Sequence, residues 1–479
     1  MNVFSLLMLL TAAVFLIGMD VSGRTKMFKV WPLFLFLPLA QNPVVLYYIY
    51  YKDGPEIFSS GMRVAHLIIV SVVLFYFWAR LNLFPVRDGH TTGIRLKVMI
   101  GGRTLVYCGF LGSALQIVLF ASFYPYLYRR GMPGPVLAAG IIYAMCILFV
   151  LFANGILRMF FTSKRLSVMR RVVMVLTLWI PVVNFIVFAL SCRLVYEEYD
   201  YACYKKKLRD IRAESNLCQT RYPILMVHGI LFRDLRFFNY WGRIPGELIR
   251  NGALIYYGNQ EAVGTTQYNG EDIRRRIIEI MKDTGCEKVN IIAHSKGGLD
   301  ARYAIGKLGM APFVASLTTI NTPHRGCLFV DKACRLPDRL YRFAARIFDG
   351  AFRKFGDKNP DFYTATRAFS TEASRKFNEE VPDAAGVYYQ SYMSKMKNRF
   401  SDSLLTITYS LIKPLEGEND GLVAVPSAQW GDYRGLFTSS GRRGISHGDM
   451  IDLKREDYKG FDVTETYVKI VSELKEKGF

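Results

Sequence analysis

The chain has 479 residues, 51% of them hydrophobic, and a formal net charge of +21 at pH 7. This length exceeds one ordinary domain, and the hydrophobic content indicates a membrane portion. The charge does not indicate a nucleic acid partner, because much of it lies between apolar segments of residues 1–195, where basic loops contact anionic lipid head groups. The acidic residues of that part are only Asp20, Asp53, Glu56 and Asp88.

Six apolar segments predict a transmembrane helical domain over residues 1–195, most of them near the length that a bilayer requires. They are residues 3–18, 30–51, 64–78, 104–128, 136–157 and 172–192. No Lys or Arg precedes Arg24, so the first segment lacks the basic start of a cleavable signal peptide and is interpreted as a retained span. The second segment contains Pro32, Pro38, Gln41, Asn42 and Pro43, which predict a kinked or re-entrant element.

The loop cations predict the orientation of this domain, since basic loops stay in the cytoplasm. The loops after the second and fourth segments carry only Lys52, Arg63, Arg129 and Arg130. The loops after the first, third and fifth carry more: Arg24, Lys26, Lys29, Arg80, Arg87, Arg95, Lys97, Arg103, Arg158, Lys164, Arg165, Arg170 and Arg171. Six spans then place both termini outside, although the basic cluster at 205–212 favours the opposite. The spans contain almost no ionisable residue, and His66 lies near the end of one. Because a transporter usually carries charged groups inside its spans, we expect an anchor rather than a transporter.

Residues 196–220 are expected to be a juxtamembrane linker, and residues 221–479 a second domain. Its central motif is 289–305, VNIIAHSKGGLDARYAI. A buried strand, a tight turn at Gly297 and Gly298 and a helix are predicted, with Ser295 at the strand-to-helix turn. Such a turn exposes the hydroxyl as a nucleophile, with Ala293 in place of the usual first glycine. A serine that merely caps a helix is the alternative interpretation.

The earlier stretch 222–229, YPILMVHG, predicts a strand that ends in His-Gly. With the turn at Ser295 following, the backbone N–H groups of Ile230 and Lys296 are candidates for an oxyanion hole. A plain strand end with a glycine turn is the alternative.

The general base is found by elimination among six histidines. His66 and His90 belong to the membrane half, and His228, His294 and His324 have places in or beside strands. His447, in the loop sequence GISHGD, remains and fits the chain order serine, acid, histidine. Asp420, in a GENDG turn after a strand expected at 405–410, is the candidate acid, with Glu418 as the fallback. A surface histidine and an ordinary turn are the alternatives.

These motifs together resemble the bacterial triacylglycerol lipases of the α/β-hydrolase fold. VHG, GEDI, KVNIIAHSKGGLDARY, NTPHRG, STEASRKFN, VPDAAGV and NDGLV carry the resemblance, over about residues 222–474. It implies an α/β fold with a mostly parallel sheet flanked by helices and a helical lid insertion, here preceded by an all-α transmembrane domain. It also implies a triad of Ser295, Asp420 and His447.

Some lipases of this kind hold a structural calcium ion through an aspartate at the place of Asp449, with a second carboxylate from near Asp402. Calcium takes six to eight oxygen ligands, so two carboxylates do not establish a site, and we expect no metal. No phosphate-binding loop or dinucleotide motif is present, so no cofactor and no nucleotide is expected. The eight cysteines show no metal-ligand spacing, and Cys327 and Cys334 are a candidate disulfide if the domain lies outside the cell.

The lid is expected over about 327–400, where residues 339–355 place an aromatic face beside a basic one. Such a helix suits a lipid surface, although packing on the hydrolase core is equally compatible. We therefore expect an integral membrane protein of the bacterial plasma membrane, with an extracytoplasmic serine hydrolase domain that cleaves carboxylic esters of lipids. Its partners are the lipid or ester substrate and the membrane. The alternatives are a phospholipase or acyltransferase using the same triad, and a transport or sensing protein with a non-catalytic hydrolase-like domain.

Overall fold

The computed structural model describes residues 37–53, 58–85, 93–166, 168–177, 180–212, 215–231, 239–456, 458 and 460–479. The chain divides into two compact units, Met1–Leu208 and Arg209–Phe479. The division falls within helix α8 (Pro181–Arg212).

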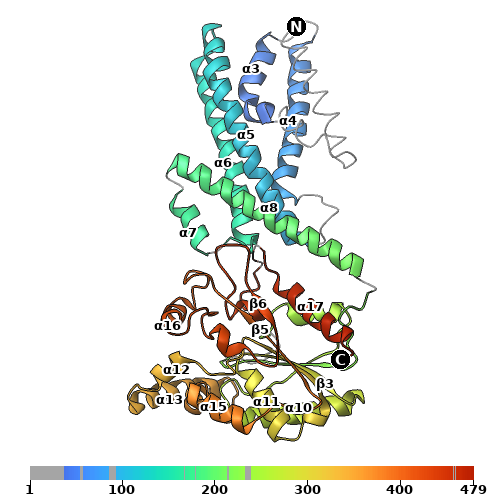
Figure 1. The fold of residues 1–479 in the computed structure, drawn as a ribbon. Coiled ribbons are helices and arrows are strands. Elements are labelled where there is room, and N and C mark those ends of the chain that lie inside the picture. The colour runs from blue at the N-terminus through green and yellow to red at the C-terminus, as the bar shows by residue number, and fades with distance from the viewer. Residues whose placement is uncertain are drawn as a thin grey trace. The chain divides into compact units, whose positions relative to one another are not determined.

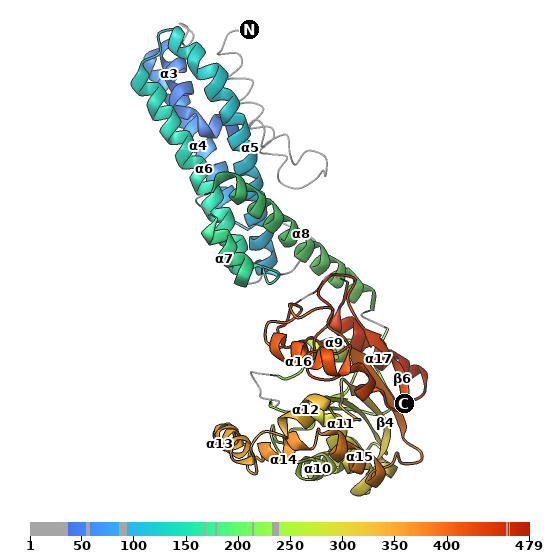
Figure 2. The same cartoon turned by 60° about the vertical axis from the view of Figure 1, so that its left-hand side comes forward.

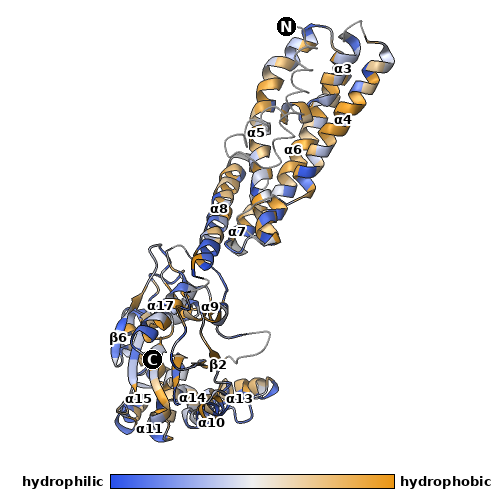
Figure 3. Cartoon of the chain, turned by 90° about the vertical axis from the view of Figure 1, so that its right-hand side faces the viewer, coloured by the Kyte–Doolittle hydropathy of each residue, from blue (hydrophilic) through white to orange (hydrophobic). Residues whose placement is uncertain are grey.

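The first unit is helical (Figure 1). Besides α8 it contains α3 (Pro43–Asp53), α4 (Ser60–Leu83), α5 (Ile94–Arg129), α6 (Gly134–Thr162) and α7 (Val168–Leu176). Within the described residues, α4, α5 and α6 have the length and apolar composition needed to cross a bilayer. They coincide with the third, fourth and fifth expected spans, and Figure 3 shows their largely apolar sequence. Many of their large side chains, such as Phe75 and Phe149, are exposed, which suits a surface that faces lipid.

Two glycines let α5 and α6 pack closely. A Cβ atom on Gly102 of α5 would lie 2.8 Å from the carbonyl oxygen of Gly155 on α6, and one on Gly155 would lie 2.8 Å from that of Gly102. Small residues at such contacts are typical of helices that associate in a membrane.

The first, second and sixth expected spans do not appear as complete helices in the described residues. The first, residues 3–18, lies outside the described residues, as does the start of the second. Residues 37–41 are helical, and the helix is interrupted at Asn42, in the stretch expected to be kinked or re-entrant, before α3 begins. The expectation of one continuous span at 172–192 is wrong, because α7 ends at Leu176 and α8 begins at Pro181 and continues to Arg212. Proline disfavours helical geometry in the residue before it, which accounts for the break.

The second unit contains a sheet of six parallel strands in the order β2-β1-β3-β4-β5-β6 (Figures 1 and 2). The strands are β1 (Ile224–Val227), β2 (Ile255–Tyr257), β3 (Val289–His294), β4 (Val314–Ile320), β5 (Tyr388–Ser394) and β6 (Asp432–Phe437). Every pairing is parallel. The carboxyl ends of all six strands therefore lie along one edge, where sites of such sheets form.

Helices cover both faces of this sheet. The described helices are α9 (Ile244–Arg250), α10 (Thr266–Thr284), α11 (Lys296–Lys307), α12 (Leu328–Ala333), α13 (Asp338–Lys354), α14 (Phe362–Arg367), α15 (Thr371–Glu380), α16 (Thr406–Glu416) and α17 (Val463–Glu476), with short 3-10 turns at Ala311–Phe313, Val425–Ala428 and Asp449–Ile451.

Alternate strand residues build two separate cores. Ile224 and Met226 of β1 pack with α9 and α17, whereas Leu225 and Val227 of the same strand pack with α10 and α11. Opposite faces for neighbouring residues are the period of a strand, and helices on both faces explain why the strand is apolar throughout. The predicted fold class, a parallel sheet with flanking helices after a helical N-terminal part, is confirmed.

Two local expectations are wrong. Residues 405–410, expected as a strand, lie mostly in helix α16, because a short run of apolar and β-branched residues fits either structure. The helical insertion does not extend to residue 400, because α15 ends at Glu380 and β5 of the central sheet follows. Cys327 and Cys334 are both free thiols.

Candidate active site

Ser295 lies between the end of β3 and the start of α11. Its backbone has φ 53° and ψ −129°, a conformation that non-glycine residues rarely adopt and that persists only where surrounding structure enforces it. A Cβ atom on Gly297 would lie 2.3 Å from the carbonyl oxygen of His228, and one on Gly298 would lie 2.3 Å from Thr322 Oγ1. The sharp turn therefore requires both glycines.

The His228-Gly229 loop at the end of β1 lies beside this turn. A Cβ atom on Gly229 would be 2.8 Å from the Cβ of Ser295. The N–H of Leu231 donates to the carbonyl oxygen of Ala262 at 2.9 Å, so it is already used in a hydrogen bond. The N–H of Ile230 has no hydrogen-bond partner within the described residues. Lys296 is the first residue of α11, where a backbone N–H has no partner inside the helix.

Asp420 and His447 meet through their side chains, with His447 Nδ1 2.7 Å from Asp420 Oδ2. The other oxygen of Asp420 accepts the N–H groups of Leu422 at 2.9 Å and Val423 at 2.8 Å. Asp420 is fully buried, so this carboxylate is held in one orientation. The fallback acid Glu418 points elsewhere, because its carboxylate pairs with Lys395 Nζ at 2.6 Å.

His294 connects His447 to the turn at Ser295. Its ring centroid lies 4.5 Å from that of His447, and its Nδ1 lies 2.7 Å from the hydroxyl of Tyr240. Burial, reinforced by the neighbouring His447, holds the pKa of His294 well below its usual value, so this imidazole stays neutral. The sequence did not single out Tyr240, because its position 54 residues before His294 has no local signal.

The side chain of Lys296 is buried under the turn. Its Nζ lies 2.6 and 2.8 Å from the two carboxylate oxygens of Asp300, and Asn269 donates to the same carboxylate at 3.0 Å. A fully buried ion pair with a further hydrogen bond fixes the first turn of α11. The spacing of four residues on one helix was the signal that could have revealed this pair from the sequence.

The remaining histidines have other partners. His228 contacts the backbone oxygens of Gly229 and Gln260, and His324 lies 3.0 Å from Thr319 Oγ1. His66 contacts the hydroxyl of Tyr50 in the first unit, and His90 lies outside the described residues. The structure thus brings Asp420 to His447 and brings the Gly229 loop to Ser295.

The carboxylates that the resemblance offers to calcium do not fit a metal. Asp402 Oδ1 lies 2.8 Å from Lys454 Nζ, and Asp449 Oδ2 lies 2.8 Å from Arg443 Nη1. Oxygens that contact ammonium and guanidinium groups leave little room for a cation that needs six to eight oxygen ligands. Within the described part of the chain, no cluster of three or more His, Cys, Asp or Glu side chains is arranged to hold a metal ion.

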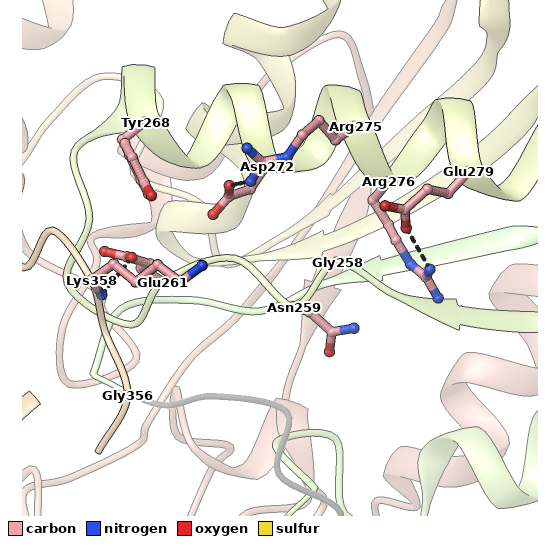
Figure 4. Close-up of a pocket in the computed structure, with 10 residues that line it drawn as sticks. All are labelled: Gly258, Asn259, Glu261, Tyr268, Asp272, Arg275, Arg276, Glu279, Gly356 and Lys358. Atoms are coloured by element: carbon pink, nitrogen blue, oxygen red, sulfur yellow. Dashed lines mark hydrogen bonds and ion pairs between the residues drawn. The ribbon is translucent and has the colours of Figure 1, made fainter. Parts of the chain in front are cut away.

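A separate pocket of about 210 Å³ lies between α10 and the loop after β2 (Figure 4). Its lining is polar, charged or glycine: Gly258, Asn259, Glu261, Tyr268, Asp272, Arg275, Arg276, Glu279, Gly356 and Lys358. Arg275 pairs with Asp272 and Arg276 with Glu279. Such a lining does not suit an acyl chain, because the charged groups would lose water without gaining partners.

The parallel sheet, its strand-turn-helix at Ser295 and its helices on both faces define a protein of the α/β-hydrolase class. A family model described as "Putative serine esterase (DUF676)" matches residues 224–338. The triacylglycerol lipase of Vibrio cholerae is 30% identical over 253 residues, which cover 46% of this chain and 80% of that lipase. Triacylglycerol lipase 2 of Saccharomyces cerevisiae is 30% identical over 269 residues, covering 52% and 77%. The chain belongs to the triacylglycerol lipase family.

The match is partial for other relatives. The chain spans about half the length of two further triacylglycerol lipases, 51% and 55%. Among solved structures, the mature lipase BlEst2 of Bacillus licheniformis aligns with 52% of this chain and 91% of its own, at 20% identity and a TM-score of 0.39.

Proposed function

We propose that this protein is a membrane-anchored serine hydrolase that cleaves carboxylic esters of lipids, in the manner of a triacylglycerol lipase or esterase. The observation that carries the proposal is the 2.7 Å contact between His447 Nδ1 and Asp420 Oδ2, in a loop whose histidine ring lies against His294, the residue before Ser295. A buried carboxylate on one imidazole nitrogen leaves the other nitrogen to act as a base.

In the proposed reaction, His447 Nε2 takes the proton of the Ser295 hydroxyl while Ser295 Oγ attacks the ester carbonyl carbon. The negative charge on the carbonyl oxygen is held by the N–H groups of Ile230 and Lys296, and each such donor is worth about 3 kcal/mol in the transition state. His447 then gives its proton to the departing alcohol, and an acyl-serine remains. Water, deprotonated by His447, releases the fatty acid and restores Ser295.

The test is fatty acid release by the full chain in detergent, from emulsified triacylglycerol, a soluble short-chain ester and phospholipid, for wild type and Ser295→Ala. We expect release from triacylglycerol or the short-chain ester in the wild type and loss of it in the variant. Release from phospholipid alone, or acyl transfer to an added alcohol in preference to water, would favour the alternative phospholipase or acyltransferase. Equal release by both proteins would contradict a Ser295 nucleophile.

We further propose that the first unit anchors the protein in a bacterial plasma membrane with the hydrolase domain on the extracytoplasmic side. The distribution of Lys and Arg among the loops of the first 195 residues supports this orientation. Labelling of intact cells with a membrane-impermeant maleimide tests it through Cys286, which is half-buried, with Cys286→Ser as the control. Labelling at Cys286 only after lysis would place the domain in the cytoplasm.

Cys218 is the wrong probe for this experiment. Its side chain is fully buried, and burial raises the pKa of its thiol to about 12. Because the thiolate is the reactive form, Cys218 stays unlabelled on either side of the membrane.

A further inference from the structure

The residue before His447 is held by two buried carboxylates. The hydroxyl of Ser446 donates to Asp402 Oδ2 at 2.7 Å, and the N–H of Ser446 donates to Asp449 Oδ2 at 2.8 Å. Asp402 and Asp449 are each 3% exposed, and Ser446 is completely buried. The position of the His447 backbone therefore depends on where these two carboxylates lie.

Each carboxylate has a cationic side chain as partner. The guanidinium of Arg443 faces Asp449 with two nitrogens, Nη2 at 2.9 Å from Oδ1 and Nη1 at 2.8 Å from Oδ2. Lys454 Nζ lies 2.8 Å from Asp402 Oδ1, and Arg443 Nη2 lies 4.0 Å from Asp402 Oδ2. A positive side chain thus faces each of the two buried carboxylates and offsets the cost of burying its charge.

Arg443 is itself fixed in place. Its guanidinium carbon lies 3.7 Å from the centre of the Tyr458 ring. Its carbonyl oxygen accepts the N–H of Lys397, and the N–H of Ile445 donates to the carbonyl oxygen of Lys395 at 2.8 Å. Residues 395–397 directly follow β5, so the segment that carries His447 is tied to the end of a central strand.

A calcium ion between two carboxylates would neutralise them and fix the loop they hold. We propose that Arg443 and Lys454 do this instead, as positioning residues for His447 that make the hydrolase independent of calcium. The inference rests on the proposed function, because positioning of His447 matters only if His447 is the base. It adds to that function two residues that touch neither the ester nor the reacting atoms.

The experiment compares ester hydrolysis by the full chain in detergent for wild type, Arg443→Met, Arg443→Lys and Lys454→Met. Arg442→Met is the matched control, since Arg442 is the neighbouring arginine and is exposed. We expect Arg443→Met to lower kcat by about tenfold to a hundredfold with KM unchanged, the order of loss that a misplaced catalytic group causes. Lys454→Met should also lower kcat. Arg443→Lys should retain more of the kcat than Arg443→Met does, and Arg442→Met should have the kcat of the wild type.

Metal dependence gives the second readout. EDTA and added calcium leave the kcat and the thermal unfolding midpoint of the wild type unchanged if Arg443 and Lys454 replace the ion. A wild type that loses activity in EDTA and regains it with calcium would overturn the inference. So would an Arg443→Met variant that is folded and retains full kcat.

Failure of the proposed function is a separate outcome. A wild type that hydrolyses no ester and does not react with a fluorescent alkyl phosphonate removes the proposed function. The unfolding midpoints of the same variants, with and without EDTA, then still report whether Arg443 and Lys454 or calcium holds the loop.

Discussion

His447 and Asp420 are joined twice. The imidazole Nδ1 of His447 lies 2.7 Å from Asp420 Oδ2, and the backbone N–H of His447 donates to the backbone oxygen of Asp420 at 2.9 Å. The two residues are 27 positions apart and belong to different loops. Contacts through both main chain and side chain fix the ring relative to the carboxylate, which a general base requires.

The first prediction concerns this pair. We expect Asp420→Asn to lower kcat about ten-thousand-fold, because an amide cannot stabilise the imidazolium and favours the wrong tautomer of His447. The measurement is hydrolysis of a soluble ester at saturating concentration. Glu418→Gln is the control, since Glu418 pairs with Lys395 at 2.6 Å and should leave kcat unchanged. A larger loss in the Glu418 variant would assign the acid to Glu418.

The second prediction concerns the tight turn after Ser295. In Gly297→Ala the new methyl group meets the carbonyl oxygen of His228 at 2.3 Å, so backbone must shift. We expect a loss of about 1–3 kcal/mol in the free energy of unfolding. Gly350→Ala is the control, because nothing lies within 4 Å of a Cβ there and it lies within α13. That variant should gain about 0.5–1 kcal/mol, and a similar loss in both would contradict the close packing at Gly297.

The third prediction is a pH dependence. Because the pKa of Asp402 is lowered in the folded protein, its stabilising contribution is present above the pKa of an unfolded aspartate, about 3.9, and is lost as pH falls through the lower folded value. The unfolding midpoint of wild type should therefore exceed that of Lys454→Met by a constant amount near neutrality. That difference should shrink below about pH 4. A difference that persists unchanged in acid would mean that Lys454 stabilises the fold without pairing with Asp402.

The fourth prediction concerns the exposed face of α13. Phe343 and Ile347 are 62% and 59% exposed, and arginines flank them on the same helix. If this face contacts lipid, Phe343→Ser with Ile347→Ser lowers hydrolysis of emulsified ester several-fold and leaves hydrolysis of a soluble ester unchanged.

Leu254→Ser is the matched control for α13. Leu254 is also exposed, but it precedes β2 and so belongs to the edge of the sheet opposite the carboxyl ends of the strands. Equal losses on emulsified and soluble ester would mean that α13 acts by packing on the hydrolase core.

The parts of the fold that could be predicted are those with a local pattern. The apolar run before Ser295, predicted as a buried strand, is β3. Strand β5 was not predicted. Its sequence, YYQSYMS, shows no clear alternation of apolar and polar residues, and it follows a helical insertion. Its burial comes from neighbours on both sides in the sheet, which a single sequence does not reveal.

The same limit applies to the candidate site. Ser295, Gly229 and Asp420 lie in short motifs that are visible in the sequence, and the motif at Gly229 takes its interpretation from the turn at Ser295. Lys454 lies 52 residues from Asp402, so its contact depends on the finished fold. Helix α8 begins at Pro181, and a proline disfavours helical geometry in the residue before it. The apolar residues on both sides nevertheless have the length of one continuous span, so the break did not follow from composition.

The most direct test of the central claim is reaction of the full chain in detergent with a fluorescent alkyl phosphonate, which bonds to an activated serine. Wild type, Ser295→Ala and Ser472→Ala are compared, the last because Ser472 is a partly exposed serine on α17. We predict labelling of wild type and Ser472→Ala and its loss in Ser295→Ala. Labelling that persists in a folded Ser295→Ala variant, or a folded wild type that is not labelled, would contradict Ser295 as the nucleophile.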